Sequence, residues 1–174
     1  MKSMKTVYKI IAIGLFVTPF LYYLWTLRPV EILSEEALYN SDPQGVHGLF
    51  IGNESGFPGG YYYNVVVDHL PLTKWDQVHW YIVMESEIKV SLHIPDKIAH
   101  HISIWDVGGG FINPHRSGDG DLVCFRNIKS ENNCIEKNHR LSIDVSEYGQ
   151  EKFDFSSDDR TWILTKQGEL VTYE

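Results

Sequence analysis

The first long pattern in the chain is an uninterrupted apolar run. Residues 10–27 read IIAIGLFVTPFLYYLWTL and contain no charged side chain. A helix rises about 1.5 Å per residue, and the hydrocarbon of a bilayer is roughly 30 Å thick, so a run of this length can cross it. The pattern therefore predicts a membrane anchor over residues 10–28, preceded by a short cytoplasmic segment at residues 1–9.

A second pattern, with β-branched and aromatic residues, begins after the anchor. VHGLFI at 46–51 and YYYNVVVDHL at 61–70 are separated by the Gly- and Pro-rich stretch GNESGFPGG, which predicts a hairpin. Residues 29–44 mix charged and turn-forming residues without periodicity, and we interpret them as a tether. The expected folded domain is therefore residues 45–174.

The period lengthens to that of a helix after Pro71. Thr73 precedes Asp76 by three residues, as at a helix N-terminus, and apolar positions recur at about 3.6 residues from Trp75 to Leu92. Pro95 disfavours a helical residue before it, so the helix is expected over residues 74–92.

The period returns to two after His100. Strand-like segments occur at 101–107, 121–128, 140–147, 152–155, 161–165 and 169–173, separated by turn-forming residues. The pattern predicts an α+β fold, in which an N-terminal transmembrane helix is followed by a mainly antiparallel β-sheet domain with one packed helix.

The flanks of the apolar run distinguish an anchor from a cleaved signal peptide. A signal peptide has an apolar run of only about 7 to 15 residues that ends at small residues, whereas this run ends in TLRPVEI. Lys2, Lys5 and Lys9 precede the run and only Arg28 follows it closely. The positive-inside rule then places the N-terminus in the cytoplasm and the domain in the periplasm, as for a single-pass protein of a bacterial inner membrane.

The charges divide sharply along the chain. Four of the 15 Lys and Arg residues lie within the first 29 positions, whereas all 23 Asp and Glu residues come later, so residues 30–174 carry a net charge of −12. This sign argues against binding to nucleic acid and favours a basic protein partner, such as a secreted toxin. A solubilising acidic surface is the alternative interpretation.

Cys124 and Cys134 are the two cysteines, and they flank the polar loop FRNIKSENN. In an oxidising periplasm this arrangement predicts a disulfide bond. A redox pair usually has CxxC spacing, and a metal site needs further ligands, so both alternatives are less favoured.

Motifs for catalysis and for cofactor binding are weak. The histidines lack the spacing of a metal site, and SGDGD, which contains Asp119 and Asp121, lacks the other ligands of a calcium loop. Asp106 precedes GGG at 108–110, but no phosphate-binding motif and no GxSxG motif occurs. We therefore expect no enzyme, no cofactor and no metal, with an enzyme in which Asp106, Asp119 and Asp121 converge as the alternative.

The aromatic residues of the domain are the remaining signal for binding. If Tyr61 and Tyr63 face outward on their strand, Tyr62 faces inward. Packing in the core is the alternative for much of this aromatic set. The candidate binding surface comprises Tyr61, Tyr63, Trp80, Trp105, Asp106, Asp119 and Asp121.

Several stretches together resemble one protein family. These are MKSMK at 1–5, LRPVEI at 27–32, IWDVGGGF at 104–111 and LVCFRNIKSENNCIEKN at 122–138. They are similar to small enterobacterial inner-membrane proteins classed as a domain of unknown function (number 943). By analogy with small anchored periplasmic proteins encoded near interbacterial toxins, the resemblance implies an immunity protein that neutralises a toxin. The alternative is an accessory or structural protein of an envelope complex.

Overall fold

The computed structural model describes residues 2–38, 61–118 and 120–173, with side chains described from Gly14 onward. The elements in chain order are α1 (Lys2–Thr26), β1 (Ile32–Leu38), β2 (Tyr61–Val67), α2 (Lys74–Ser91), β3 (His100–Asp106), α3 (Pro114–Ser117), β4 (Leu122–Cys124), β5 (Cys134–Glu136), β6 (His139–Val145), β7 (Glu151–Phe155), β8 (Thr161–Leu164) and β9 (Leu170–Thr172).

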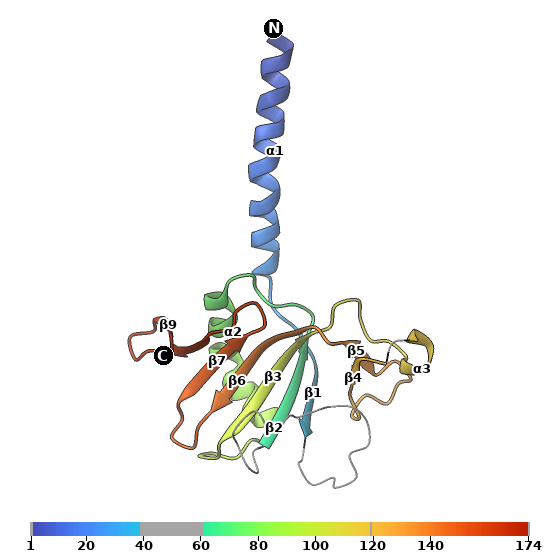
Figure 1. The fold of residues 1–174 in the computed structure, drawn as a ribbon, viewed down its shortest axis with the longest axis vertical. Coiled ribbons are helices and arrows are strands. Elements are labelled where there is room, and N and C mark those ends of the chain that lie inside the picture. Colours follow the sequence, from blue (N-terminus) through green and yellow to red (C-terminus); the bar gives the residue numbers. More distant parts are fainter. Residues whose placement is uncertain (1, 39–60, 119, 174) are drawn as a thin grey trace.

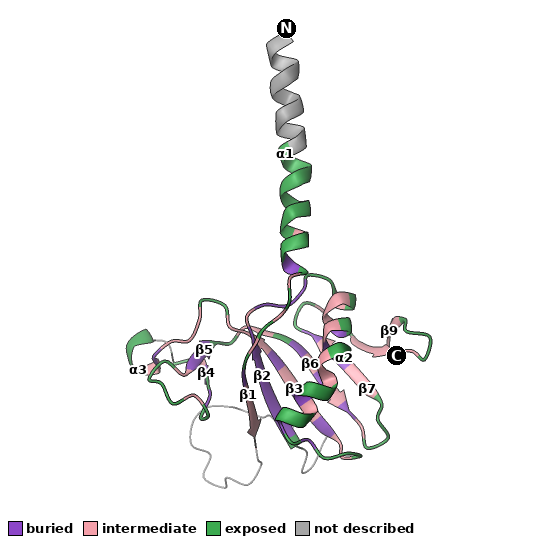
Figure 2. Ribbon diagram, turned by 180° about the vertical axis from the view of Figure 1, so that it is seen from behind, coloured by how far each residue is buried: buried purple, intermediate pink, exposed green. Residues whose placement is uncertain are grey.

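The domain is built on a seven-stranded sheet in the order β1-β2-β3-β6-β7-β8-β9. Neighbouring strands are antiparallel except for β2 and β3, which are parallel and are connected through α2. Parallel neighbours need such a crossover because a tight turn cannot return the chain to the same end of the sheet. Figure 2 shows α2 lying across one face of the sheet.

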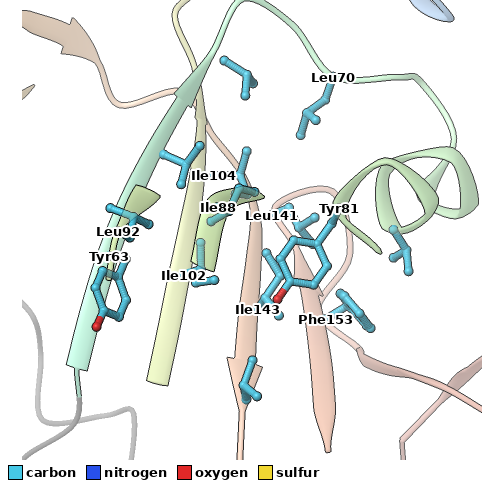
Figure 3. Packing of buried hydrophobic residues seen from close by; sticks show 14 of the residues in the cluster. Tyr63, Leu70, Tyr81, Ile88, Leu92, Ile102, Ile104, Leu141, Ile143 and Phe153 are labelled. Atoms are coloured by element: carbon cyan, nitrogen blue, oxygen red, sulfur yellow. The ribbon is translucent and has the colours of Figure 1, made fainter. Parts of the chain in front are cut away.

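Helix α2 forms where the sequence predicts it. The Thr73 hydroxyl accepts a hydrogen bond from the backbone N–H of Asp76 at 3.1 Å, which caps the first turn. Its inner side buries Val78, Tyr81 and Ile88 against the sheet. Figure 3 shows Tyr81 and Ile88 among the core residues of the strands. The sheet contributes alternate residues to this core, which are Tyr63, Val65, Val67, Ile102, Ile104, Leu141, Ile143, Val145, Phe153 and Phe155.

The opposite face of the sheet, which we call the open face, is partly covered by a smaller unit. Strands β4 and β5 form a separate two-stranded sheet, and with the residues around them, 111–137, they make what we call the disulfide arm. Val123, Phe125 and Ile135 of the arm pack against Val66 of β2 in a second apolar cluster. The prediction that 121–128 belongs to the main sheet is therefore wrong.

The expected tether is also corrected. Within residues 29–44, Ile32–Leu38 form edge strand β1, which pairs antiparallel with β2. The mixed composition of ILSEEAL hid this strand because an edge strand can carry charged residues toward solvent. The strand predicted at 46–51 lies outside the described residues. The strands predicted near 61–70, 101–107, 140–147, 152–155, 161–165 and 169–173 are confirmed with small changes of boundary.

Helix α1 stands away from the domain and joins it at one end of the sheet (Figure 1). Its described part exposes large apolar side chains, including Leu15, Phe16 and Phe20. Among the residues that the structure describes, no helix combines the length and the apolar character needed to cross a membrane. At the junction, the Arg28 guanidinium donates a hydrogen bond of 2.8 Å to Asp68.

A candidate binding site on the open face of the sheet

The centre of the open face carries a chain of hydrogen-bonded polar side chains. The register places His101 of β3 beside Asp144 of β6, and Ser103 beside Ser142. The Nδ1 atom of His101 lies 2.7 Å from Asp144 Oδ1, and its Nε2 atom lies 3.0 Å from Ser103 Oγ. A carboxylate only accepts, so Nδ1–H donates to Asp144, and in the neutral ring Nε2 accepts from the Ser103 hydroxyl.

A second histidine continues this polar cluster toward the other end of β6. His139 Nδ1 lies 2.7 Å from Ser156 Oγ, and its Nε2 lies 2.9 Å from Ser142 Oγ. Burial lowers the pKa of His139, and a proton on His101 would act in the same direction. His139 is therefore neutral at neutral pH and can both donate and accept hydrogen bonds.

Trp105 of β3 contacts both neighbouring strands, β2 and β6. Its indole N–H donates to Asn64 Oδ1 at 2.9 Å, and its ring meets His139 edge-on with centroids 5.0 Å apart. Tryptophan offers a large contact area with few rotatable bonds, which makes it a frequent anchor of binding surfaces. We call Trp105, His101, Ser103, His139, Ser142 and Asp144 the open-face cluster.

The order Ser103–His101–Asp144 is that of a hydroxyl next to a base that a carboxylate orients. Acyl transfer also needs N–H donors aimed at the developing oxyanion. Ser103 lies in the middle of β3, which is paired with β2 on one edge and β6 on the other, so the ladders use the backbone groups around it.

Charged side chains of both signs lie on the strands that carry the cluster and on β7 beside them. The Arg140 guanidinium donates to Asp106 Oδ2 at 3.2 Å, and Lys152 lies over the ring of Tyr173 at 4.2 Å. Asp106 also accepts from the backbone N–H of Gly108 at 2.8 Å, which fixes its side chain at the end of β3.

The disulfide arm borders the cluster on the β2 side. Cys124 and Cys134 lie opposite each other on β4 and β5 and form the predicted disulfide bond. The Asn127 amide donates to the backbone oxygen of Glu35 at 2.7 Å, which attaches the loop of the arm to edge strand β1. The arm is thereby held at both its base and its loop.

The structure does not bring the predicted surface residues together. Tyr63 is 3% exposed and packs on the α2 side, and Trp80 lies on α2 itself, partly buried against the same core. Tyr61 is 36% exposed at the start of β2, and Asp121 is exposed and pairs with Lys137. Trp105 does lie at the open face. Asp106 lies at the end of β3, in the cavity beside the end of α1, and Asp119 lies outside the described residues.

The sequence interpretation missed the polar half of this site. His101, Ser103, Ser142 and Asp144 occupy every second position of HHISIWD and HRLSIDV, between apolar residues that enter the core. Alternation alone carries this signal, because the residues of one strand that share a face are two apart. The strand register decides which histidine lies beside which carboxylate, and this register cannot be read from the sequence.

A separate titratable cluster lies at the edge of the α2 side. Burial raises the pKa of Glu151 to about 7, and the negative charge of Glu85 adds to the effect. The Tyr81 hydroxyl donates to Glu151 at 3.4 Å, and Lys89 pairs with Glu85 one helical turn away. At this end of the sheet a cavity of about 400 Å³ is lined by His100, Lys89 and the β6–β7 turn.

Across residues 14–38, 61–118 and 120–173, no group of three or more His, Cys, Asp or Glu side chains is arranged to hold an ion.

Comparisons with known proteins identify the family. No curated protein and no solved structure matches the chain. A family profile with the description "Enterobacterial putative membrane protein (DUF943)" matches residues 1–174, the whole of the sequence. The chain therefore belongs to this family of enterobacterial membrane proteins.

Proposed function

We propose that this is a single-pass inner-membrane protein whose periplasmic domain binds a protein partner through the open face of its sheet. The anchor is α1, and its support is the uncharged run at residues 10–27 together with the exposure of Leu15, Phe16 and Phe20. Lys2, Lys5 and Lys9 favour a cytoplasmic N-terminus.

The open-face cluster carries the binding part of the proposal. Side chains with donors and acceptors lie beside Trp105 on a rigid scaffold of paired strands. Binding sites on strands hold their groups more accurately than sites on loops. The net charge of −12 over residues 30–174 favours a basic partner, because opposite charges accelerate and orient the encounter.

This binding would serve one of two roles. In the first, the domain is an immunity protein that neutralises a basic toxin in the periplasm. In the second, it is an accessory subunit of an envelope complex, and its partner is another inner-membrane protein. The partner's identity distinguishes these roles, so one experiment addresses both.

The experiment is a pull-down of the full chain, tagged at its C-terminus, from detergent-solubilised membranes, followed by mass spectrometry. Asp144→Lys is the test variant because it removes the hydrogen bond to His101 and reverses a charge within the cluster. Glu147→Lys is the matched control, since it makes the same charge change on the exposed β6–β7 turn. We expect Asp144→Lys to reduce the recovered partner about tenfold or more and Glu147→Lys to leave it nearly unchanged.

A basic exported protein that kills cells lacking this chain would establish the immunity role. Recovery of inner-membrane components would establish the accessory role. If no protein is recovered, or if both variants lower recovery equally, the open face is not the binding site. Digestion of the domain by protease added outside spheroplasts tests the orientation, and a domain that is protected there would contradict it.

A further inference from the structure

A second cavity lies where α1 meets the domain. Its volume is about 330 Å³, and its walls come from the last turns of α1, the segment between β2 and α2, and the neighbouring ends of β3 and β6. Tyr22, Trp25 and Thr26 contribute the α1 wall. Figure 1 shows α1 leaving the domain at this end of the sheet. With α1 as the proposed anchor, the cavity lies at the level of the lipid headgroups.

His69 is a buried polar residue in this cavity without a hydrogen-bond partner. It is 7% exposed, and neither ring nitrogen has a hydrogen-bond partner among the described residues. Its Nδ1 atom lies 2.8 Å from Asp68 Oδ1, although not aligned as a hydrogen bond, and this carboxylate favours the ring proton on Nδ1. Nε2 is then a buried acceptor, which is costly unless a donor approaches it.

Asp68 supplies a carboxylate beside His69, and Arg28 pairs with one of its two oxygens at 2.8 Å. Burial raises the pKa of Asp68, but the hydrogen bond from the Glu31 backbone, the nearby ring of His69 and the charge of Arg28 together outweigh burial and lower the pKa overall. The carboxylate is therefore ionised at neutral pH. The aromatic ring of Trp25 lies 6.2 Å from the His69 ring, so an aromatic face also borders this part of the cavity.

Arg140 supplies the positive charge on the other side of the same cavity. Its side chain is 47% exposed, and one of its nitrogens donates to Asp106 at 3.2 Å. A guanidinium has five N–H donors, so further donors remain for an anion such as phosphate. The cavity thus presents an acceptor and a carboxylate at one place and a guanidinium at another.

We propose that this cavity binds the phosphoethanolamine headgroup of a phospholipid in the periplasmic leaflet. The ammonium group donates to His69 Nε2 and is attracted by Asp68, and the phosphate is held by Arg140. A choline headgroup has no N–H donor for His69, and a glycerol headgroup has no positive charge for Asp68. The inference rests on the proposed anchoring by α1, because the anchor brings the cavity to the headgroups.

The test uses the full chain purified in detergent and incubated with equal amounts of phosphatidylethanolamine, phosphatidylcholine and phosphatidylglycerol. After washing, the retained lipids are counted by native mass spectrometry. We expect phosphatidylethanolamine to be retained about tenfold more than phosphatidylcholine, as the loss of one charge-assisted hydrogen bond predicts. Equal retention of the three lipids would overturn the proposal.

Two variants and one control sharpen this test. Arg140→Gln removes the phosphate contact, and His69→Phe keeps a ring beside Trp25 but removes the acceptor, so each should lower retention of phosphatidylethanolamine about tenfold. Arg116→Gln makes the same change as the first variant on exposed helix α3 and should have no effect. Retention that is unchanged in His69→Phe would show that His69 does not contact the lipid.

Two further measurements distinguish a failure of the proposed anchor from a failure of the cavity site. Membrane fractionation reports whether α1 anchors the chain, and His69→Phe should leave fractionation unchanged because the residue lies outside α1. Soluble glycerophosphoethanolamine is then added to the full chain in detergent without lipid. Binding of this compound by a chain absent from the membrane fraction would overturn the lipid as the ligand, whereas a membrane-bound chain that binds neither form would overturn the cavity site alone.

Discussion

The two faces of the main sheet use the same strands for different purposes. Toward α2, Ile102 and Leu141 are fully buried and touch other apolar side chains. On the opposite face lie Ser103 and Ser142, which directly follow Ile102 and Leu141 in the sequence. Both serines form hydrogen bonds with histidines instead of packing in the core. Strand alternation therefore lets one segment contribute to stability on one side and to recognition on the other.

The sharpest test of this comparison is a pair of neighbouring substitutions on β6. Leu141→Ala removes buried methyl groups and leaves a cavity, so we expect it to lower the free energy of unfolding by about 3 kcal/mol. Ser142→Ala removes one hydrogen bond to His139 on the open face and should cost less than about 1 kcal/mol. Thermal unfolding of both variants measures the difference, and equal losses would mean that the open face also stabilises the fold.

The second prediction concerns the disulfide bond of the arm that borders the open face. Replacing Cys124 and Cys134 together by serine opens the loop of the arm and should lower the free energy of unfolding by about 2 to 3 kcal/mol. The melting temperature of the unmodified chain should fall similarly in reductant. A melting temperature that reductant leaves unchanged would contradict a stabilising role for the bond.

The third prediction concerns Glu151, a carboxyl group on the α2 side whose pKa is raised. Glu151 ionises at about pH 7 in the folded chain, against an ordinary value of 4.5, so the folded state binds more protons between these pH values and stability falls as pH rises through them. Glu151→Gln removes this penalty. We expect the variant to gain about 1 to 2 kcal/mol over the parent chain at pH 8, after allowing for solvent screening, and almost nothing at pH 4.

Melting temperatures recorded between pH 4 and pH 8 measure this effect. Glu147→Gln is the control, because Glu147 lies on the exposed β6–β7 turn. A parent chain whose stability rises between pH 5 and pH 8 in parallel with the variant would show that Glu151 is not responsible.

The comparison of the two faces also explains what the sequence could predict. Helix α2 follows from a cap and a 3.6-residue period, and most strands follow from alternation, because these signals are local. Strand β1 was not predicted because its charged residues, which a sheet edge tolerates, hide the apolar alternation. Strand β4 was assigned to the main sheet because the sequence of so short a strand does not indicate which strand it pairs with.

The candidate site was harder to predict for a related reason. Trp105 and Asp106 could be selected by residue type, and the disulfide by compartment and spacing. The contact between His101 and Asp144 joins residues 43 positions apart, and it exists only because β3 and β6 pair in one register. Tyr63 illustrates the opposite error, since an aromatic residue chosen for a surface proved to be part of the core.

Strand β1 also limits where this protein can act. Only residues 27–31 separate α1 from β1, and five extended residues span at most about 18 Å. The ion pair between Arg28 and Asp68 shortens this link further. If α1 is the anchor that we propose, this short link keeps the domain within a few nanometres of the membrane surface. A partner would then have to reach the domain at that surface.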